Sequence, residues 1–175
     1  MRFVGLVLLL GSVLLGLLGL EVWPLTLTYR TNKLIHAPAE RIWKVLNSPS
    51  AERKWFRNED GSAYLTQLDL SAGKANLQGI RRELAFVPVG HWQERVVGFE
   101  PERRLVLQAK QSGPFAFYEI KYQFLPIDES DYRLSVEYTA ELRGIKNKMR
   151  YRQIKATMAS TMRYSLLGIK ALSGG

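Results

Sequence analysis

Residues 144–172 read GIKNKMRYRQIKATMASTMRYSLLGIKAL, and this stretch decides how the rest of the chain is interpreted. It contains no proline, and its apolar and small residues recur at the 3.6-residue period of a helix. One stripe collects Tyr151, Ile154, Met158, Thr161, Met162, Ser165 and Ile169. We therefore predict one long amphipathic helix that starts near Lys146, with Asn147 as its cap, and stops at Ser173-Gly174-Gly175.

The same stretch accounts for almost all of the net charge of the chain, which is formally +9 over 175 residues. No acidic residue follows Glu141, whereas eight basic residues do: Arg143, Lys146, Lys148, Arg150, Arg152, Lys155, Arg163 and Lys170. The ordinary interpretation is a core-facing stripe with a solvated opposite face. Two features differ from this interpretation. Methionine and hydroxyl-bearing residues in the stripe pack less rigidly than leucine or isoleucine would. The polar face carries only positive charges, so it attracts anions.

The N-terminal residues are predicted to form a separate segment. Phe3 to Leu20 is a run of 18 uncharged residues, and as a helix it would be about 27 Å long, close to the hydrocarbon thickness of a bilayer. The alternative is a cleaved signal peptide, but the run is long for one and no small-residue cleavage site follows. We favour an uncleaved membrane anchor over residues 1–23, followed by one domain over 24–175.

The orientation of this anchor rests on few charges. The α-amino group and Arg2 precede the span and Glu21 follows it, so the N-terminus is expected in the cytoplasm and the domain outside it. The chain has no cysteine, which excludes disulfides, thiolate metal sites and cysteine nucleophiles and leaves the redox compartment open.

The domain is predicted to begin with a strand over residues 26–35 and two short helices. Pro38 opens the first helix, over residues 38–46, and Ser48 caps a second one that ends near Trp55. From residue 64 the period changes to two, with strands at 64–70, 80–87, 92–99, 104–110, 117–125 and 132–142 separated by turn residues. The strict alternation of the last two strands predicts an antiparallel sheet with one dry face, which the C-terminal helix covers.

This order of elements resembles the START-like superfamily, also called SRPBCC, which includes polyketide cyclase/dehydrase-like and Bet v 1-like proteins. Residues 35–46, IHAPAERIWKVL, followed by Trp55, are similar to the Ala-Pro-x-Glu-x-Val-Trp helix of that family. Residues 94–105, ERVVGFEPERRL, are similar to its glutamate strand and Pro-x-Arg-Leu turn. The resemblance covers about residues 26–172 and implies an α+β helix-grip fold: a curved antiparallel sheet wrapped around a long C-terminal helix, with an apolar cavity between them. The anchor and the uniformly basic last helix depart from that pattern.

No catalytic or metal-binding constellation is visible in the sequence. His36 and His91 lack the i, i+3 or i+4 partners that metal sites use, so we interpret each as an ordinary strand-end residue. Gly-rich phosphate loops, a Gly-x-Ser-x-Gly elbow and a His-Glu-x-x-His motif are absent. We therefore expect no catalytic residues, no metal and no cofactor.

Arg82 and Glu94 are the pair that could act on a ligand. In one register of the middle strands Arg82, Leu84, Trp92 and Glu94 point toward the cavity. In the other, the residues that do are His91, Gln93, Arg95, Val97 and Phe99, and the alternation does not choose between the two. We favour an exposed ion pair, because charged residues are seldom buried. The functional alternative is a polar clasp for a ligand head group.

Three hypotheses follow for function. The first is a membrane-tethered domain that binds a hydrophobic small molecule or lipid, with the basic helix near anionic head groups. Its predicted pocket is lined by Trp43, Trp55, Arg82, Leu84, Trp92, Glu94, Leu107, Tyr122, Tyr138, Met158 and Met162. The second is a cyclase, hydrolase or isomerase that uses the same cavity, and the third is a partner-binding module with a filled core and an unknown protein partner. Nucleic-acid binding is not expected, because the charge lies on one packed helix behind an anchor.

Overall fold

The computed structural model describes residues 11, 13, 14, 16, 23–56, 63–69, 81–86, 90–128 and 131–174. Its fold is α+β, with seven strands in one antiparallel sheet. The elements, in chain order, are β1 Leu25–His36, α2 Ala39–Asn47, α3 Pro49–Trp55, β2 Ala63–Asp69, β3 Arg81–Phe86, β4 Gly90–Glu100, β5 Arg104–Ser112, β6 Phe115–Pro126, β7 Asp131–Leu142, α4 Ile145–Met149 and α5 Tyr151–Ser173. The predicted strand, two short helices, six strands and terminal helix are all confirmed.

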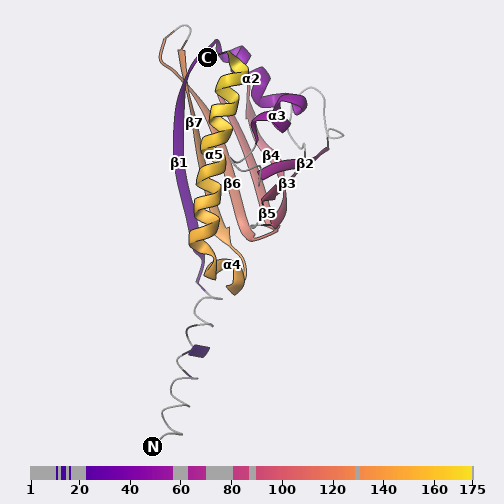
Figure 1. Cartoon of the computed structure of the whole chain (residues 1–175), viewed down its shortest axis with the longest axis vertical. Helices are drawn as coiled ribbons and strands as arrows, with labels where there is room; N and C mark the ends of the chain where they lie inside the picture. Colours follow the sequence, from indigo (N-terminus) through magenta and orange to yellow (C-terminus); the bar gives the residue numbers. More distant parts are fainter. Residues whose placement is uncertain are drawn as a thin grey trace, which may run out of the picture.

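The strands form a meander that the first strand completes. Their order in the sheet is β1-β7-β6-β5-β4-β3-β2, so β2 to β7 are consecutive neighbours and β1 pairs with β7. Figure 1 shows α5 lying along one face of this curved sheet, with α2 and α3 beside its C-terminal end. The helix-grip architecture expected from the resemblance is therefore the observed one.

α5 uses the predicted stripe to cover the sheet. Ile154, Met158, Met162 and Ile169 are fully buried, and the hydroxyl-bearing positions of the stripe are buried with them. The Thr161 hydroxyl donates to the Thr157 carbonyl at 2.9 Å, which satisfies it within the helix. Thr161 can therefore occupy the stripe without an unsatisfied hydroxyl, whereas the buried hydroxyl of Ser165 has no hydrogen-bond partner within the described residues.

The start of the helix differs from the prediction. The chain forms a five-residue α4 and turns at Arg150 before α5 begins at Tyr151. Asn147 is not a cap: its side-chain amide donates to the Arg143 carbonyl at 2.8 Å. Lys148 instead turns inward and donates to the Trp23 carbonyl at 2.9 Å, a contact that a continuous amphipathic helix would not predict.

α3 lies close against α5, and a glycine allows the approach. An added Cβ on Gly168 would lie 2.8 Å from Trp55 Cα and 2.9 Å from Trp55 Cβ. These are backbone-fixed atoms, so the whole of α3 would have to move to admit a methyl group. Gly168 thus sets the spacing between the two helices.

We expect Gly168→Ala to lower the free energy of unfolding by about 1–3 kcal/mol through overpacking. Alanine is the better helix former by about 1 kcal/mol, so a net loss would identify the contact with α3 as its cause. Urea unfolding followed by circular dichroism measures the effect. The control is Ala156→Gly at an exposed position of α5, which isolates the propensity term; a stabilised Gly168→Ala protein would contradict the packing described.

The predicted membrane anchor lies almost entirely outside the described residues. Of residues 3–20 only Gly11, Val13, Leu14 and Gly16 are described, and all four are helical and exposed. Within the described part of the chain, no helix is both long and apolar enough to cross a membrane.

Candidate ligand-binding site

Most of the predicted pocket residues lie on the inner face of the sheet or on the facing side of α5. Leu107, Tyr122 and Tyr138 of the sheet, Met158 and Met162 of α5, and Trp55 at the end of α3 are all buried there. They contact one another closely; the rings of Trp55 and Tyr122, for example, meet edge to face with centroids 6.1 Å apart. In this central region the described side chains pack closely on one another between sheet and helix.

The structure resolves the register of the middle strands. Glu94 and Val96 are buried, whereas His91, Gln93 and Arg95 are exposed. The preferred interpretation, an exposed ion pair, is therefore wrong for Glu94, whose side chain is only 5% exposed. In the backbone register Arg82 pairs with Glu94 and Leu84 with Trp92; the side chains of Arg82, Leu84 and Trp92 lie outside the described ones.

A bulge makes β4 change face along its length. Pairing with β5 slips between Val96 and Gly98, so Phe99, which would point outward in an uninterrupted strand, pairs with the buried Leu105. Phe99 then contacts Trp43 of α2, with ring centroids 5.1 Å apart. Each of the two registers considered from the sequence thus holds for one part of the strand.

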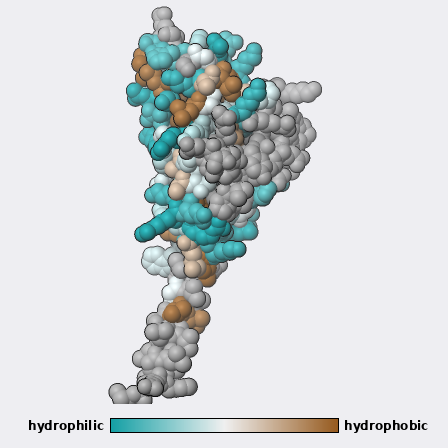
Figure 2. All heavy atoms as spheres, in the orientation of Figure 1, coloured by the Kyte–Doolittle hydropathy of each residue, from teal (hydrophilic) through white to brown (hydrophobic). Residues whose placement is uncertain are grey.

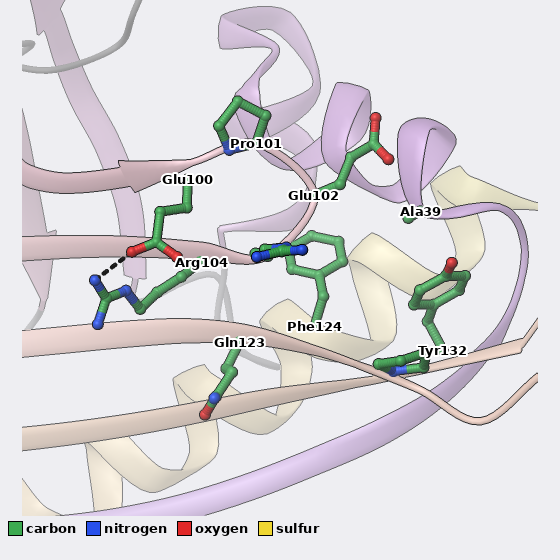
Figure 3. Close-up of a pocket in the computed structure, with 10 residues that line it drawn as sticks. Ala39, Glu100, Pro101, Glu102, Arg104, Gln123, Phe124 and Tyr132 are labelled. Carbon is green, nitrogen blue, oxygen red and sulfur yellow. Dashed lines mark hydrogen bonds and ion pairs between the residues drawn. The ribbon is translucent and has the colours of Figure 1, made fainter.

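A pocket lies where this strand ends, at the end of the domain away from Trp23. Its volume is about 580 Å³, and we call it the distal pocket. It is bounded by the β4–β5 turn, the ends of β6 and β7, and the first residue of α2 (Figure 3). The residues that line it are Ala39, Glu100, Pro101, Glu102, Arg103, Arg104, Gln123, Phe124, Pro126 and Tyr132.

Aromatic side chains form the apolar part of this pocket. Phe124 lines it and packs edge to face on Trp43, with ring centroids 5.4 Å apart. Trp43 in turn contacts Phe99, so Phe124 lines the pocket as the outer member of a cluster of three rings from α2, β4 and β6. Figure 3 places Phe124 between Tyr132 and Ala39 on one side and the paired Glu100 and Arg104 on the other.

Charged side chains form the rim. Arg104 donates to Glu100, an exposed pair that contributes little to stability. Arg103 is also exposed, and within the described residues its guanidinium has no hydrogen bond or ion pair; only its backbone is engaged, with Glu100 and Phe124. Glu102, at the tip of the turn, has φ +57°, which holds the rim in a conformation that few non-glycine residues adopt.

A second pocket contains the buried Glu94. It has a volume of about 400 Å³ between β4 and β5, and it is lined by Gln93, Glu94, Arg95, Gln108, Ala109, Lys110, Gln111 and Ser112. The predicted site residues are therefore divided: Glu94 lines this pocket, Trp43 supports the distal pocket, and the other described ones belong to the core. In the described chain no three His, Asp or Glu side chains come together as a metal site.

Sequence comparison agrees with this architecture. Residues 26–174 match the profile of the family described as polyketide cyclase/dehydrase and lipid transport. The chain belongs to this family. The match spans β1 to the end of α5 and confirms the resemblance to the START-like superfamily. No curated protein matches the chain in sequence.

Several solved structures share the fold of this chain at low sequence identity. TTHA0849 from Thermus thermophilus is 20% identical, with a TM-score of 0.65 over 83% of this chain and 96% of its own. The ZhuI aromatase/cyclase from Streptomyces sp. R1128 is 13% identical, with a TM-score of 0.66 over 86% and 94%. Norcoclaurine synthase from Thalictrum flavum, in complex with dopamine and hydroxybenzaldehyde, is 16% identical, with a TM-score of 0.61 over 87% and 88%.

Sequence reasoning missed the distal pocket of this family member. Its rim residues Glu100 and Glu102 lie between the strands predicted at 92–99 and 104–110, in a turn, where acidic side chains are commonplace. One signal was present: Pro101-Glu102-Arg103-Arg104 concentrates charge in one short turn that directly follows an aromatic residue, Phe99. The sequence does not show the bulge in β4, after which Phe99 contacts Trp43 directly before that turn.

Tyr138 gives the core a testable pH dependence. Its hydroxyl is buried without a hydrogen-bond partner within the described residues, and burial, followed by the neighbouring Tyr29 and Tyr151, raises its pKa. The unfolded chain releases this proton near pH 10, while the folded chain retains it. The stability that this group contributes is therefore complete below about pH 10 and falls by up to about 1.4 kcal/mol per pH unit above it.

We expect Tyr138→Phe to change stability by less than about 1 kcal/mol at neutral pH, because no described partner is lost. Above about pH 10 the variant should lose stability less steeply than the wild-type protein. Urea midpoints measured across this range provide the comparison. Parallel profiles for the two proteins would contradict the burial of the hydroxyl.

Proposed function

We propose that this domain binds a largely hydrophobic small molecule or lipid that carries an anionic group. The observation that carries the proposal is the distal pocket, which is lined by the rings of Phe124 and Tyr132 and by Arg103, an arginine whose side chain has no partner within the described chain. A volume of about 580 Å³ suits a ligand of ordinary small-molecule size. The apolar body would contact Phe124, and the Arg103 guanidinium would hold the anionic group.

This proposal places the ligand at a different part of the domain from the one predicted from the sequence. The sequence indicated a cavity between the middle of the sheet and α5, where Trp55, Tyr122 and Tyr138 are packed. The distal pocket instead opens at the end of the same inner layer, next to Trp43. The ligand would thus contact the core at its edge.

We further propose that residues 1–23 tether the domain to a membrane as a single-pass anchor, with the domain on the extracytoplasmic side. The support is the uncharged run from Phe3 to Leu20 and the charges that flank it. Retention of the chain in membranes washed with alkaline carbonate, and access of a protease to the domain in sealed vesicles, test the anchor and its orientation separately.

A second candidate function is an enzyme that uses Glu94. Glu94 is buried and is among the residues that line a pocket of about 400 Å³. A buried carboxylate that a ligand can reach is the kind of group that serves as a general acid or base, so this function requires the pocket to extend to the Glu94 side chain. This hypothesis predicts that Glu94→Gln abolishes turnover and leaves the fold intact. Unchanged turnover in that variant would exclude the role.

The binding proposal is tested with a fluorescent anionic probe, 1-anilinonaphthalene-8-sulfonate, and a variant that fills the pocket. Gln123 lines the distal pocket and is exposed, so Gln123→Trp would occupy it without disturbing the core. We expect the wild-type domain to bind the probe and the variant to lose that binding. The control is Lys121→Trp, two residues earlier on β6 and outside the pocket; equal probe binding by all three proteins would contradict the assignment.

A further inference from the structure

The end of the domain nearest the N-terminus exposes two large apolar side chains. Trp23 is 75% exposed and Met149, the last residue of α4, is 73% exposed. Isolated exposed apolar residues need no explanation. These two lie at the same end of the fold, because α4 is attached to the start of β1.

The attachment is made by a buried lysine. Lys148 is only 6% exposed, and its ammonium group donates to the Trp23 carbonyl at 2.9 Å. This bond joins residues 125 positions apart in the chain. It fixes Met149, the next residue, beside the point where the chain enters the domain.

Basic residues are concentrated in α4 and the first turns of α5, on either side of Met149 in the chain. Of the eight cations after Glu141, six fall between residues 143 and 155, and only Arg163 and Lys170 lie further along α5. Lys146 and Arg152 are exposed and have no partner within the described residues, whereas Arg143 donates to the Gln111 carbonyl and Arg150 to the Gln153 side chain. Figure 2 shows hydrophilic residues gathered over this lower end of the domain, around α4 and the start of α5.

The nearest acidic residues in sequence are Glu141, at the end of β7, and Glu21, before Trp23. Neither offsets the six cations. Exposed basic residues close to an exposed tryptophan and methionine differ from an ordinary solvated face, which mixes both signs of charge and lacks large apolar groups. This combination matches the surface of an anionic bilayer, where indoles and long basic side chains reside at the head-group level.

We propose that this basal surface, formed by Trp23, Arg143, Lys146, Met149, Arg150 and Arg152, docks on a bilayer that contains anionic phospholipids. Trp23 and Met149 enter the head-group region, and the basic side chains contact lipid phosphates. The inference goes beyond the proposed function, because it concerns the folded domain itself and requires neither a ligand in the distal pocket nor a membrane-spanning anchor.

Docking at this end determines where the distal pocket faces. α5 has 23 residues and therefore spans about 34 Å between the basal surface and the opposite end of the domain. The pocket lies at that opposite end (Figure 1). A docked domain consequently presents its pocket to the aqueous phase or to a facing membrane, and not to the bilayer on which it sits.

The test uses the full chain, which has no cysteine, so a single Met149→Cys substitution carries one nitroxide label. The chain is mixed with vesicles of phosphatidylcholine alone, or with added phosphatidylglycerol, as detergent is removed. We expect the label on the vesicle-bound chain to lose accessibility to a water-soluble nickel chelate only when phosphatidylglycerol is present. A label at Leu172→Cys, at the far end of α5, is expected to remain accessible in both lipids.

Charge variants distinguish docking through the basal surface from a general electrostatic attraction between the basic chain and anionic vesicles. In the Met149→Cys background, Lys146→Gln with Arg152→Gln is expected to weaken docking about 30-fold, because each cation at the surface contributes about a fivefold step. Arg163→Gln with Lys170→Gln removes the same charge from the other part of α5 and is expected to change docking little. Equal loss in both pairs, or a label equally accessible in both lipids, would overturn the proposal.

Flotation of the vesicles distinguishes docking from the anchor. If residues 1–23 do not hold the chain in phosphatidylcholine vesicles, docking still predicts flotation with phosphatidylglycerol vesicles. If the anchor holds the chain in both lipids, only the depth of the label reports docking. Absence from both vesicle types would overturn docking and anchoring together.

Discussion

Trp55→Ala is expected to lower the free energy of unfolding by about 3–5 kcal/mol, the range found for buried aromatic residues. Trp55 is fully buried, and three layers of the fold meet at its side chain. Its indole N–H donates to the Val45 carbonyl of α2 at 3.1 Å, its ring meets Tyr122 of β6, and its backbone abuts Gly168 of α5. Removing the ring leaves a cavity at this junction and a carbonyl without its donor.

The control for this variant is Trp55→Phe. Phenylalanine retains an aromatic ring but no N–H donor, so we expect a smaller loss of about 1–3 kcal/mol. Urea unfolding followed by far-ultraviolet circular dichroism gives both values without depending on tryptophan fluorescence. A loss below about 1 kcal/mol for Trp55→Ala would mean that α2 and α3 are not packed on α5 as described.

Arg103→Gln is expected to weaken binding of the anionic probe in the distal pocket about 10- to 100-fold, corresponding to one charge-assisted hydrogen bond of about 1.5–3 kcal/mol. Arg103 is exposed at the rim, and its guanidinium has no described partner, so the substitution leaves no orphaned carboxylate behind. The fold is expected to remain intact. Fluorescence titration at fixed ionic strength measures the affinity.

Arg133→Gln provides the matched control. Arg133 is an exposed arginine on β7 outside the distal pocket, so this substitution removes the same charge without touching the rim. Any difference between the two variants therefore reports a local contact rather than the net charge of the chain. Equal affinities in both variants would remove Arg103 from the site.

The fold could be predicted from the sequence because local periodicity and global packing agree. The alternation in residues 117–125 and 132–142 predicts which faces of β6 and β7 are buried. The 3.6-residue stripe of α5 predicts the helix surface that covers them. Gly168 is an exception that the pattern could not explain, since its role depends on a backbone contact with Trp55, more than 100 residues earlier.

The candidate site could be predicted only in part, because it depends on irregularities. A bulge after Val96 changes which residues of β4 face inward, and no alternation of apolar and polar residues signals where such a slip occurs. The break at Arg150 lies two residues after Lys148, which donates to the Trp23 carbonyl, and such a contact between distant parts of the chain has no local signal in the sequence. The sequence therefore predicted one residue near the distal pocket, Trp43, which packs on the lining residue Phe124. It did not predict Arg103 and Tyr132, which line the pocket.

The measurement that tests the central claim most directly is native mass spectrometry of residues 23–175 purified from cells, followed by solvent extraction of any bound molecule. This span includes every strand and helix of the matched family domain, which begins at residue 26. Binding in the distal pocket predicts a defined added mass on the wild-type domain, which extraction releases as a hydrophobic anionic compound and which is missing from Gln123→Trp. A wild-type domain that carries no added mass and does not bind the anionic probe would contradict the claim, and Glu94→Gln would then be the next variant to measure.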